Sequence, residues 1–246
     1  MIKEMQHFVP KYRYRFFNDV DKQHYQFSKD GKYIGKRGIG NSTSAEKFLY
    51  EATNGEYNIN DLENYFSDNI EPKQKELIEK IINLINSRNV LNYERYKKHP
   101  LYYVDLNIDD ILSFINTSIL RLPEIIEYMN KKTLNKLNFF KTLNTFSGIC
   151  YNHQINILYT SKNVHFILPD CGLIRGRTAD KVGRTIIPLT PNICIEFIIY
   201  SETNILQTNT DIFINQASDE WVRWVNKESI RECYEKFVSR YEKYDV

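Results

Sequence analysis

Four short runs in the C-terminal half decide the fold class: ICYNHQINILYTS at 149–161, NVHFILPD at 163–170, TIIPLTP at 185–191 and NICIEFIIYS at 192–201. They are rich in Ile, Val and Tyr, and they are bounded by Asn, Pro and Gly. Short β-branched and aromatic runs between turn-forming residues are typical of antiparallel strands. Residues 146–215 are therefore predicted to form strands.

The N-terminal segment 1–40 is predicted to add two or three further strands. It is aromatic and interrupted by turns, and Lys29-Asp30-Gly31-Lys32 is a hairpin signal between Tyr- and Phe-rich runs. Between the two strand regions, 43–145 is predicted to be helical. A Ser or Thr at 42–44 could cap a helix over Glu46–Tyr50.

Prolines are predicted to divide the helical middle. Apolar residues recur at spacings of three and four in 59–89 and in 107–143, as in amphipathic helices. Pro72 predicts that two helices meet near Ile70–Pro72, and Pro123 predicts a kink or a break. The segment 216–246 is predicted to be a final helix.

These segments predict one α+β domain over 1–246: a mostly antiparallel sheet of N- and C-terminal strands with the helical middle packed on it. The 246 residues suffice for a core, in which 18 Tyr and 14 Phe should dominate the packing. The formal charge of +2 does not by itself indicate a nucleic-acid or membrane partner.

Cysteine spacing and hydropathy exclude several classes of protein. Cys150, Cys171, Cys194 and Cys233 form no CxxC pair, so we expect reduced and mostly buried thiols rather than a zinc knuckle or a thioredoxin motif. The N-terminus lacks an apolar signal core, and no run could span a bilayer. A cytoplasmic protein without a membrane partner is expected.

Several motifs, in order along the chain, carry a resemblance to a known family. His7-Phe8-Val9-Pro10-Lys11 is followed by Phe16-Phe17, and then come LENYFSDNIEPKQKELIEKI (62–81), SILRLPE (118–124), VHFILPDCG (164–172) and TIIPLTP (185–191), with Ile214-Asn215 before the last helix. This series resembles a bacterial family of unassigned activity, domain of unknown function 4238. The resemblance implies a shared polar set: His7, Glu63, Glu71, Arg121 and Asp170.

This polar set is suited to phosphodiester hydrolysis. An imidazole can transfer protons, a carboxylate can orient it or bind a divalent ion such as Mg²⁺, and a guanidinium can pair with phosphate. The same residue types also form structural networks, in which Arg121 bridges carboxylates and His7 satisfies a buried carbonyl. Both interpretations stay open at this level.

Two basic clusters are candidate nucleic-acid contacts. The first, Lys11, Arg13 and Arg15, alternates with aromatic residues, which on a strand would place the three cations on one face. The second follows Asp170 in a Gly-containing loop and consists of Arg175, Arg177, Lys181 and Arg184. A solvated strand face and a mobile loop are the alternatives.

Other motifs carry little functional information. The GxG at Gly38–Gly40 lacks the context of a dinucleotide fingerprint, and His153 and His165 lack a third metal ligand. Trp221 and Trp224 are spaced as anchors of a helix to the core.

Three functions follow as hypotheses. The first is a nucleic-acid-acting effector of the defence or toxin kind, a nuclease with His7 as acid/base and Arg121 on phosphate, while Asp170 and a helical Glu orient His7 or bind the divalent ion. The second is a non-enzymatic binding module, a partner or sensor subunit that binds another protein. The third is a small-molecule or nucleotide-processing enzyme with a deep pocket around Asp170.

Overall fold

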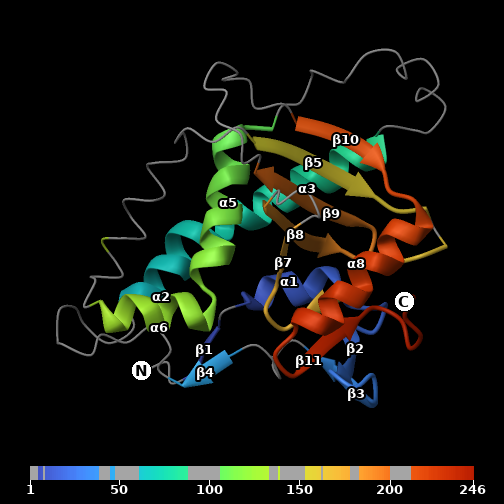
Figure 1. Cartoon of the computed structure of the whole chain (residues 1–246), viewed down its shortest axis with the longest axis horizontal. Helices are drawn as coiled ribbons and strands as arrows, with labels where there is room; N and C mark the ends of the chain where they lie inside the picture. Colours follow the sequence, from blue (N-terminus) through green and yellow to red (C-terminus); the bar gives the residue numbers. More distant parts are fainter. Residues whose placement is uncertain are drawn as a thin grey trace.

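The fold is taken from a computed structural model, which describes residues 5–7, 9–38, 45–47, 61–87, 106–132, 138, 153–161, 163–177, 183–199 and 212–246. Within these ranges the strands form a five-stranded sheet, a four-stranded sheet and a two-stranded ribbon, with helices around them (Figure 1). The predicted α+β class is confirmed, and most strand pairs are antiparallel. The single sheet that the sequence predicted is replaced by these three units.

The larger sheet contains three of the four predicted runs. Its strand order is β10 (Ile212–Gln216), β5 (His153–Tyr159), β9 (Ile193–Ile199), β8 (Gly183–Thr190) and β7 (Ile174–Arg177). Strands β5, β9, β8 and β7 are antiparallel neighbours, whereas β10 pairs with β5 in parallel. Because side chains alternate between the two faces of a strand, both faces of these apolar runs need cover.

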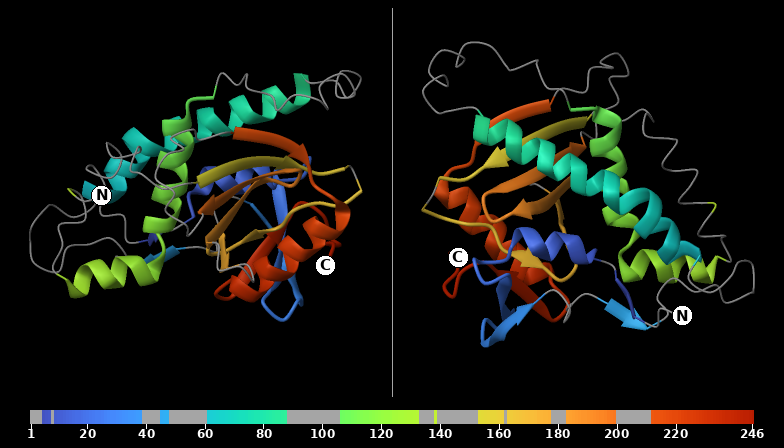
Figure 2. Two further views of the ribbon diagram at one scale, coloured as in Figure 1. Left: turned by 45° about the horizontal axis from the view of Figure 1, so that its top comes forward. Right: turned by 180° about the vertical axis from the view of Figure 1, so that it is seen from behind.

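Helices on opposite faces bury this sheet. Ile155, Ile187 and Ile195 pack with apolar residues of α3 (Glu71–Ser87) and α5 (Ile108–Leu120) in one cluster. Figure 2 shows α3 running across this face in its right-hand view. Cys194 and Leu158 face the other way and pack against α8 (Asp219–Glu232). The helices therefore exclude water from both sides of the β5–β9–β8 centre.

The smaller sheet contains the predicted hairpin. Its order is β3 (Tyr33–Gly38), β2 (Gln23–Ser28), β11 (Lys236–Ser239) and β6 (Leu168–Pro169). Gly31 has a φ of 81°, and its N–H donates to the carbonyl of Ser28. This left-handed position requires glycine at the turn, so the prediction of a hairpin at 29–32 is confirmed.

The prediction of a strand over 11–16 is wrong. These residues form the helix α1 (Lys11–Phe16), which begins directly after Pro10. Tyr12 packs in the cluster beside the large sheet, and Tyr14 packs in a second cluster with Val9 and Phe17. Six residues are too few for the alternating pattern to exclude a helix.

Two other boundaries differ from the prediction. The last helix, α8, ends at Glu232 and is followed by β11, because backbone N–H groups of 234–236 bond to Asp170. The expected helix at Glu46–Tyr50 is not formed at its described residues, since β4 (Ala45–Lys47) pairs with β1 (Met5–His7). Because β11 pairs with β2, the N-terminal hairpin belongs to a sheet separate from the larger one.

Of the two prolines expected to divide the helical middle, one does so. Pro123 is the first residue of α6 (Pro123–Lys131), so the predicted break after α5 is confirmed. At Pro72 no break occurs. Instead α2 (Asp61–Tyr65), the π-helical turn η1 (Phe66–Ile70) and α3 follow one another without interruption. The wider turn accommodates the proline at the second position of α3.

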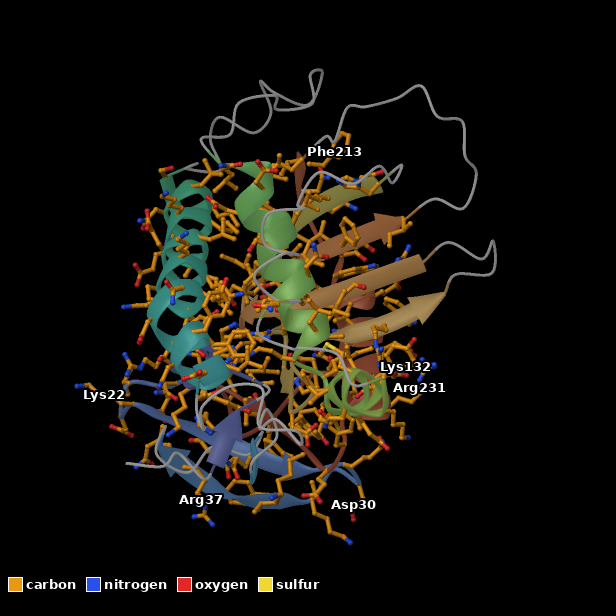
Figure 3. All side chains as sticks on the ribbon, turned by 90° about the vertical axis from the view of Figure 1, so that its left-hand side faces the viewer. Lys22, Asp30, Arg37, Lys132, Phe213 and Arg231 are labelled. Atoms are coloured by element: carbon orange, nitrogen blue, oxygen red, sulfur yellow. The ribbon has the colours of Figure 1, made fainter. Side chains whose placement is uncertain are left out.

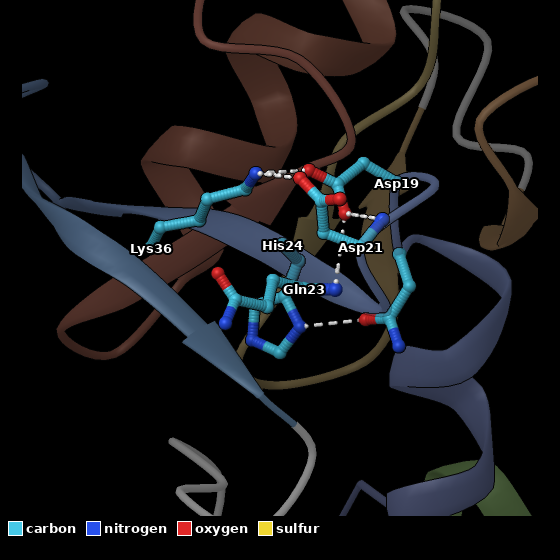
Figure 4. A network of polar contacts seen from close by, with 6 residues as sticks. Asp19, Asp21, Gln23, His24 and Lys36 are labelled. Atoms are coloured by element: carbon cyan, nitrogen blue, oxygen red, sulfur yellow. Dashed lines mark hydrogen bonds and ion pairs between the residues drawn. The ribbon is translucent and has the colours of Figure 1, made fainter.

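A buried histidine lies between α1 and the smaller sheet. His24 is 0% exposed, its Nδ1 lies 3.0 Å from Asn18 Oδ1, and its Nε2 lies 3.4 Å from Gln26 Nε2. This partner set fits a neutral ring that donates from Nδ1 and accepts at Nε2. Burial lowers the pKa of His24 to about 4, although the nearby Asp19 carboxylate opposes the shift (Figure 4).

We expect this histidine to make stability depend on pH. Its pKa is lower in the folded than in the unfolded chain, so its contribution is complete above about pH 6.5 and is lost as the pH falls toward 4. The loss should approach about 3 kcal/mol in the free energy of unfolding. Urea denaturation between pH 7 and 4.5 should show a flatter profile for His24→Gln. Parallel profiles for the two proteins would contradict this assignment.

Candidate functional site

The structure separates the five residues of the predicted polar set. Glu71 and Arg121 form an ion pair, whereas Asp170 bonds to the backbone of another segment. His7 ends β1, opposite Ala45 of β4, and its side chain lies outside the described part of the structure. Val9 packs in one cluster with Leu62 and Phe66, which places the segment after His7 against the helix that carries Glu63.

The centre of the candidate site is the pair of Arg121 and Glu71. Arg121 follows the last turn of α5, and its Nη2 donates to Glu71 Oε1 over 2.8 Å. Its guanidinium carbon lies 4.1 Å from the centroid of the Phe66 ring. The Arg121 side chain is 1% exposed and that of Glu71 is 23% exposed. Solvent therefore reaches the carboxylate but not the cation.

The π-helical turn η1 brings these groups together. It begins at Phe66, on which Arg121 stacks, and it ends directly before Glu71. Glu63, the other predicted helical carboxylate, lies buried in α2 just before the same turn. Single π-helical turns within α-helices frequently occur at functional sites, because they interrupt the regular hydrogen bonding. Both glutamates of the predicted set thus flank the irregular turn.

Tyr12 and Gln74 extend the cluster, and the sequence interpretation missed both. The Tyr12 hydroxyl donates to Gln74 Oε1 over 2.9 Å, and both side chains are buried. Gln74 lies three residues after Glu71, so it shares a helix face with the carboxylate, which was the available signal. Burial raises the pKa of Tyr12 well above its usual value, so the hydroxyl stays protonated at neutral pH. Tyr12 can donate a hydrogen bond but cannot act as a base there.

Asp170 has a structural environment. Its Oδ1 accepts from the N–H of Tyr234 over 2.7 Å, and its Oδ2 accepts from the N–H groups of Glu235 and Lys236 over 2.8 and 2.9 Å. The residue is 3% exposed. Burial raises the pKa of Asp170, and the three donors oppose the shift in part. This carboxylate fixes the turn between α8 and β11 and is separate from the Arg121 pair.

Arg13 is also a structural residue, contrary to its predicted role on an exposed basic face. Its Nη2 donates to the carbonyls of Gly172 and Pro188, each over 2.8 Å, and the residue is 2% exposed. Gly172 has a φ of 77°, and an added Cβ would lie 2.7 Å from Val9 Cγ2 and 2.9 Å from Arg13 Nη1. The glycine thus gives the guanidinium room to reach the Gly172 carbonyl.

The other predicted cations are dispersed. Lys11 and Arg15 are exposed on α1. Arg175 pairs with Glu124, and Arg184 pairs with Glu196 over 3.1 Å and lies over Trp224. The side chain of Arg177 and all of Lys181 lie outside the described ranges. Two of the four cations in the second cluster are therefore already paired with carboxylates.

Among the described side chains no group of three or more His, Cys, Asp or Glu is arranged to hold a metal ion. Cys171, Cys194 and Cys233 are free and buried, and burial raises the pKa of Cys171 and of Cys233 to about 12, whereas Cys150 lies outside the described ranges. No helix in the described part of the chain is long and apolar enough to cross a bilayer.

Replacement of Asp170 should test the assignment of this carboxylate to the fold. Asp170→Ala removes the acceptor of three partly buried backbone N–H donors, so we expect the free energy of unfolding to fall by about 3 kcal/mol. Chemical denaturation would measure the loss. Asp30→Ala, at an exposed carboxylate of the β2–β3 hairpin, is the matched control and should leave stability nearly unchanged. Equal stability of the two variants would contradict the assignment.

Comparison with known proteins places the chain in a family. No curated protein and no solved structure matches it. A family model described as Protein of unknown function (DUF4238) matches residues 5–138, more than half of the 246 residues. The match includes His7, Glu63, Glu71 and Arg121 and ends before Asp170. The chain therefore belongs to the DUF4238 family of proteins of unknown function.

Proposed function

We propose that this chain is a cytoplasmic, non-enzymatic binding module whose buried charged residues maintain its fold. The observation that carries the proposal is the burial of Arg121, which is 1% exposed and ion-paired with Glu71. A phosphate of a polymeric substrate cannot contact this guanidinium unless the Phe66 and Glu71 contacts rearrange. Loss of the partner of a buried charge costs about 3–5 kcal/mol, so such a rearrangement is unfavourable.

Two further charged groups support the same function. Arg13 bonds to two backbone carbonyls and Asp170 to three backbone N–H groups, and both are nearly inaccessible. Most hydrogen bonds of these two side chains are made with groups of the same chain, as in structural networks. The groups that remain for a partner are those on the surface. A nucleic acid or another protein is the expected kind of partner.

Glu71→Gln should reveal the structural role of the ion pair. The variant removes the charged acceptor that Glu71 offers to the buried Arg121, so we expect a loss of about 3 kcal/mol in the free energy of unfolding. Glu76→Gln is the control on the same helix, since Glu76 pairs with Lys80 at the exposed surface and its loss should change stability little. Denaturation curves for both variants measure the difference. A Glu71→Gln protein as stable as Glu76→Gln would remove the main support for the proposal.

A nuclease of the defence or toxin kind is a second candidate, favoured by the π-helical turn between Glu63 and Glu71. In this alternative His7 is the acid/base, and the partly exposed Glu71 carboxylate contacts the reacting groups while Arg121 positions it from behind. The family match includes all four residues. Asp170 has no role in this mechanism, because its oxygens bond to the β11 turn.

A cleavage assay separates the two candidates. Purified wild-type and His7→Ala proteins are incubated with labelled RNA and with single- and double-stranded DNA, with and without Mg²⁺ or Mn²⁺. The binding module predicts intact substrate with both proteins. Cleavage by the wild type alone, with equal melting temperatures, would establish the nuclease and overturn the binding module.

A further inference from the structure

A row of polar side chains crosses the larger sheet beside α8. Asn156 of β5 lies opposite Glu196 of β9, and Arg184 of β8 lies diagonally beyond Glu196 in the strand register. Asn156 Nδ2 donates to Glu196 Oε2 over 2.6 Å, and Glu196 Oε1 pairs with Arg184 Nε over 3.1 Å. Asn156 and Glu196 are buried. The row is therefore an internal polar network that ends in the Arg184 guanidinium.

The polar row lies directly beside the apolar row that α8 covers. Leu158, Cys194 and Ile186 stand two residues further along the same three strands and pack with α8. Alternate residues of a strand share a face, so both rows lie on the same side of the sheet. Arg184 thus meets the flank of α8, where its guanidinium carbon lies 5.7 Å from the centroid of the Trp224 ring.

Solvent reaches the end of this row. Trp224 is 39% exposed, and the Arg184 side chain is 24% exposed although its Nε is buried. Within the described ranges neither Nη group of Arg184 makes a hydrogen bond. A guanidinium that a carboxylate and an indole already hold in place loses little conformational entropy when a second carboxylate binds to its open edge. This arrangement distinguishes the Arg184–Trp224 pair from side chains that are merely exposed.

Positive charge surrounds Trp224 on α8. Lys227 is exposed one turn after Trp224, and Arg223 lies one turn before Lys227 on the same side of the helix. Neither cation forms an ion pair within the described part of the chain. Arg231, labelled in Figure 3, is by contrast paired with two glutamates of its own helix. Two cations against the exposed carboxylate of Glu220 leave a net positive surface.

We propose that Trp224, Arg184 and Lys227 bind an acidic segment of a partner protein, with a carboxylate on the Arg184 Nη groups and an apolar side chain against the indole. The inference rests on the proposed function, of which it names the partner. Trp and Arg are the residue types most enriched among the residues that dominate protein interfaces. A nucleic acid is disfavoured, because the guanidinium already lies over the indole ring on which a base would stack, and Glu220 would repel phosphates.

Selection of a displayed library of random peptides on the wild-type protein tests this proposal. The enriched peptides should combine Asp or Glu with an apolar residue. A labelled synthetic copy of the most enriched peptide, measured by fluorescence anisotropy, should bind less tightly as the salt concentration rises. Trp224→Ala should weaken its binding roughly 30-fold. Arg184→Lys should also weaken it, because lysine keeps the charge but lacks the planar fork.

Two further variants separate binding from folding. Lys227→Glu changes one exposed side chain, so it should weaken peptide binding at an unchanged melting temperature. Tyr128→Ala is the matched control, since Tyr128 is 57% exposed on α6 and its removal deletes an accessible ring from a different element. This variant should bind as wild type does.

Four results would overturn the proposal: no enriched peptide, enriched peptides without acidic residues, equal affinities of Trp224→Ala and Tyr128→Ala, or binding of labelled RNA that Trp224→Ala abolishes. Peptides that bind at another surface would overturn the assignment of this surface alone and would preserve the binding module. Cleavage of an oligonucleotide by the wild-type protein would instead overturn the non-enzymatic function.

Discussion

The rest of the structure depends on the buried guanidinium of Arg13. It comes from the short helix α1 and donates to the carbonyl of Gly172, just beyond β6, and to that of Pro188 in β8. One side chain thus connects the N-terminal helix to the larger sheet and to the loop between β6 and β7. Burial of an unpaired charge costs several kcal/mol, so this arrangement is stable only while both carbonyls are in place. Burial disfavours the charged form of Arg13 and so lowers its pKa. The same close packing restricts the positions of the surrounding backbone.

Asp170, at the start of the same loop, binds the backbone of the C-terminal segment. Its carboxylate accepts three backbone N–H groups and fixes the start of β11, which then pairs with β2 and β6. Without β11 the N-terminal hairpin would have no sheet to join. Between Asp170 and β7, Gly172 has a positive φ and no Cβ, so the chain there can approach Val9 and Arg13 closely. The charged residues around this loop therefore assemble the two sheets.

Burial also determines which charged side chains can contact a partner. Arg121, Arg13 and Asp170 are engaged inside the protein, whereas the Glu71 carboxylate is partly open to solvent. The π-helical turn remains the irregular feature of the interior, since it places Phe66 under Arg121 and Glu71 at its end. The Glu71 carboxylate is thus the part of this charged cluster that solvent reaches.

The sequence by itself determined those elements whose signals are local. The Ile-rich runs predicted β5, β8 and β9, Gly31 predicted the hairpin, and Pro123 predicted the start of α6. Only the tertiary structure decided that 11–16 is a helix, that β11 follows α8, and that Asp170 lies apart from Arg121. The reason is that the role of a charged side chain depends on the groups around it. The partners of Arg13 lie 159 and 175 residues further along the chain, and no local pattern encodes contacts at such a separation.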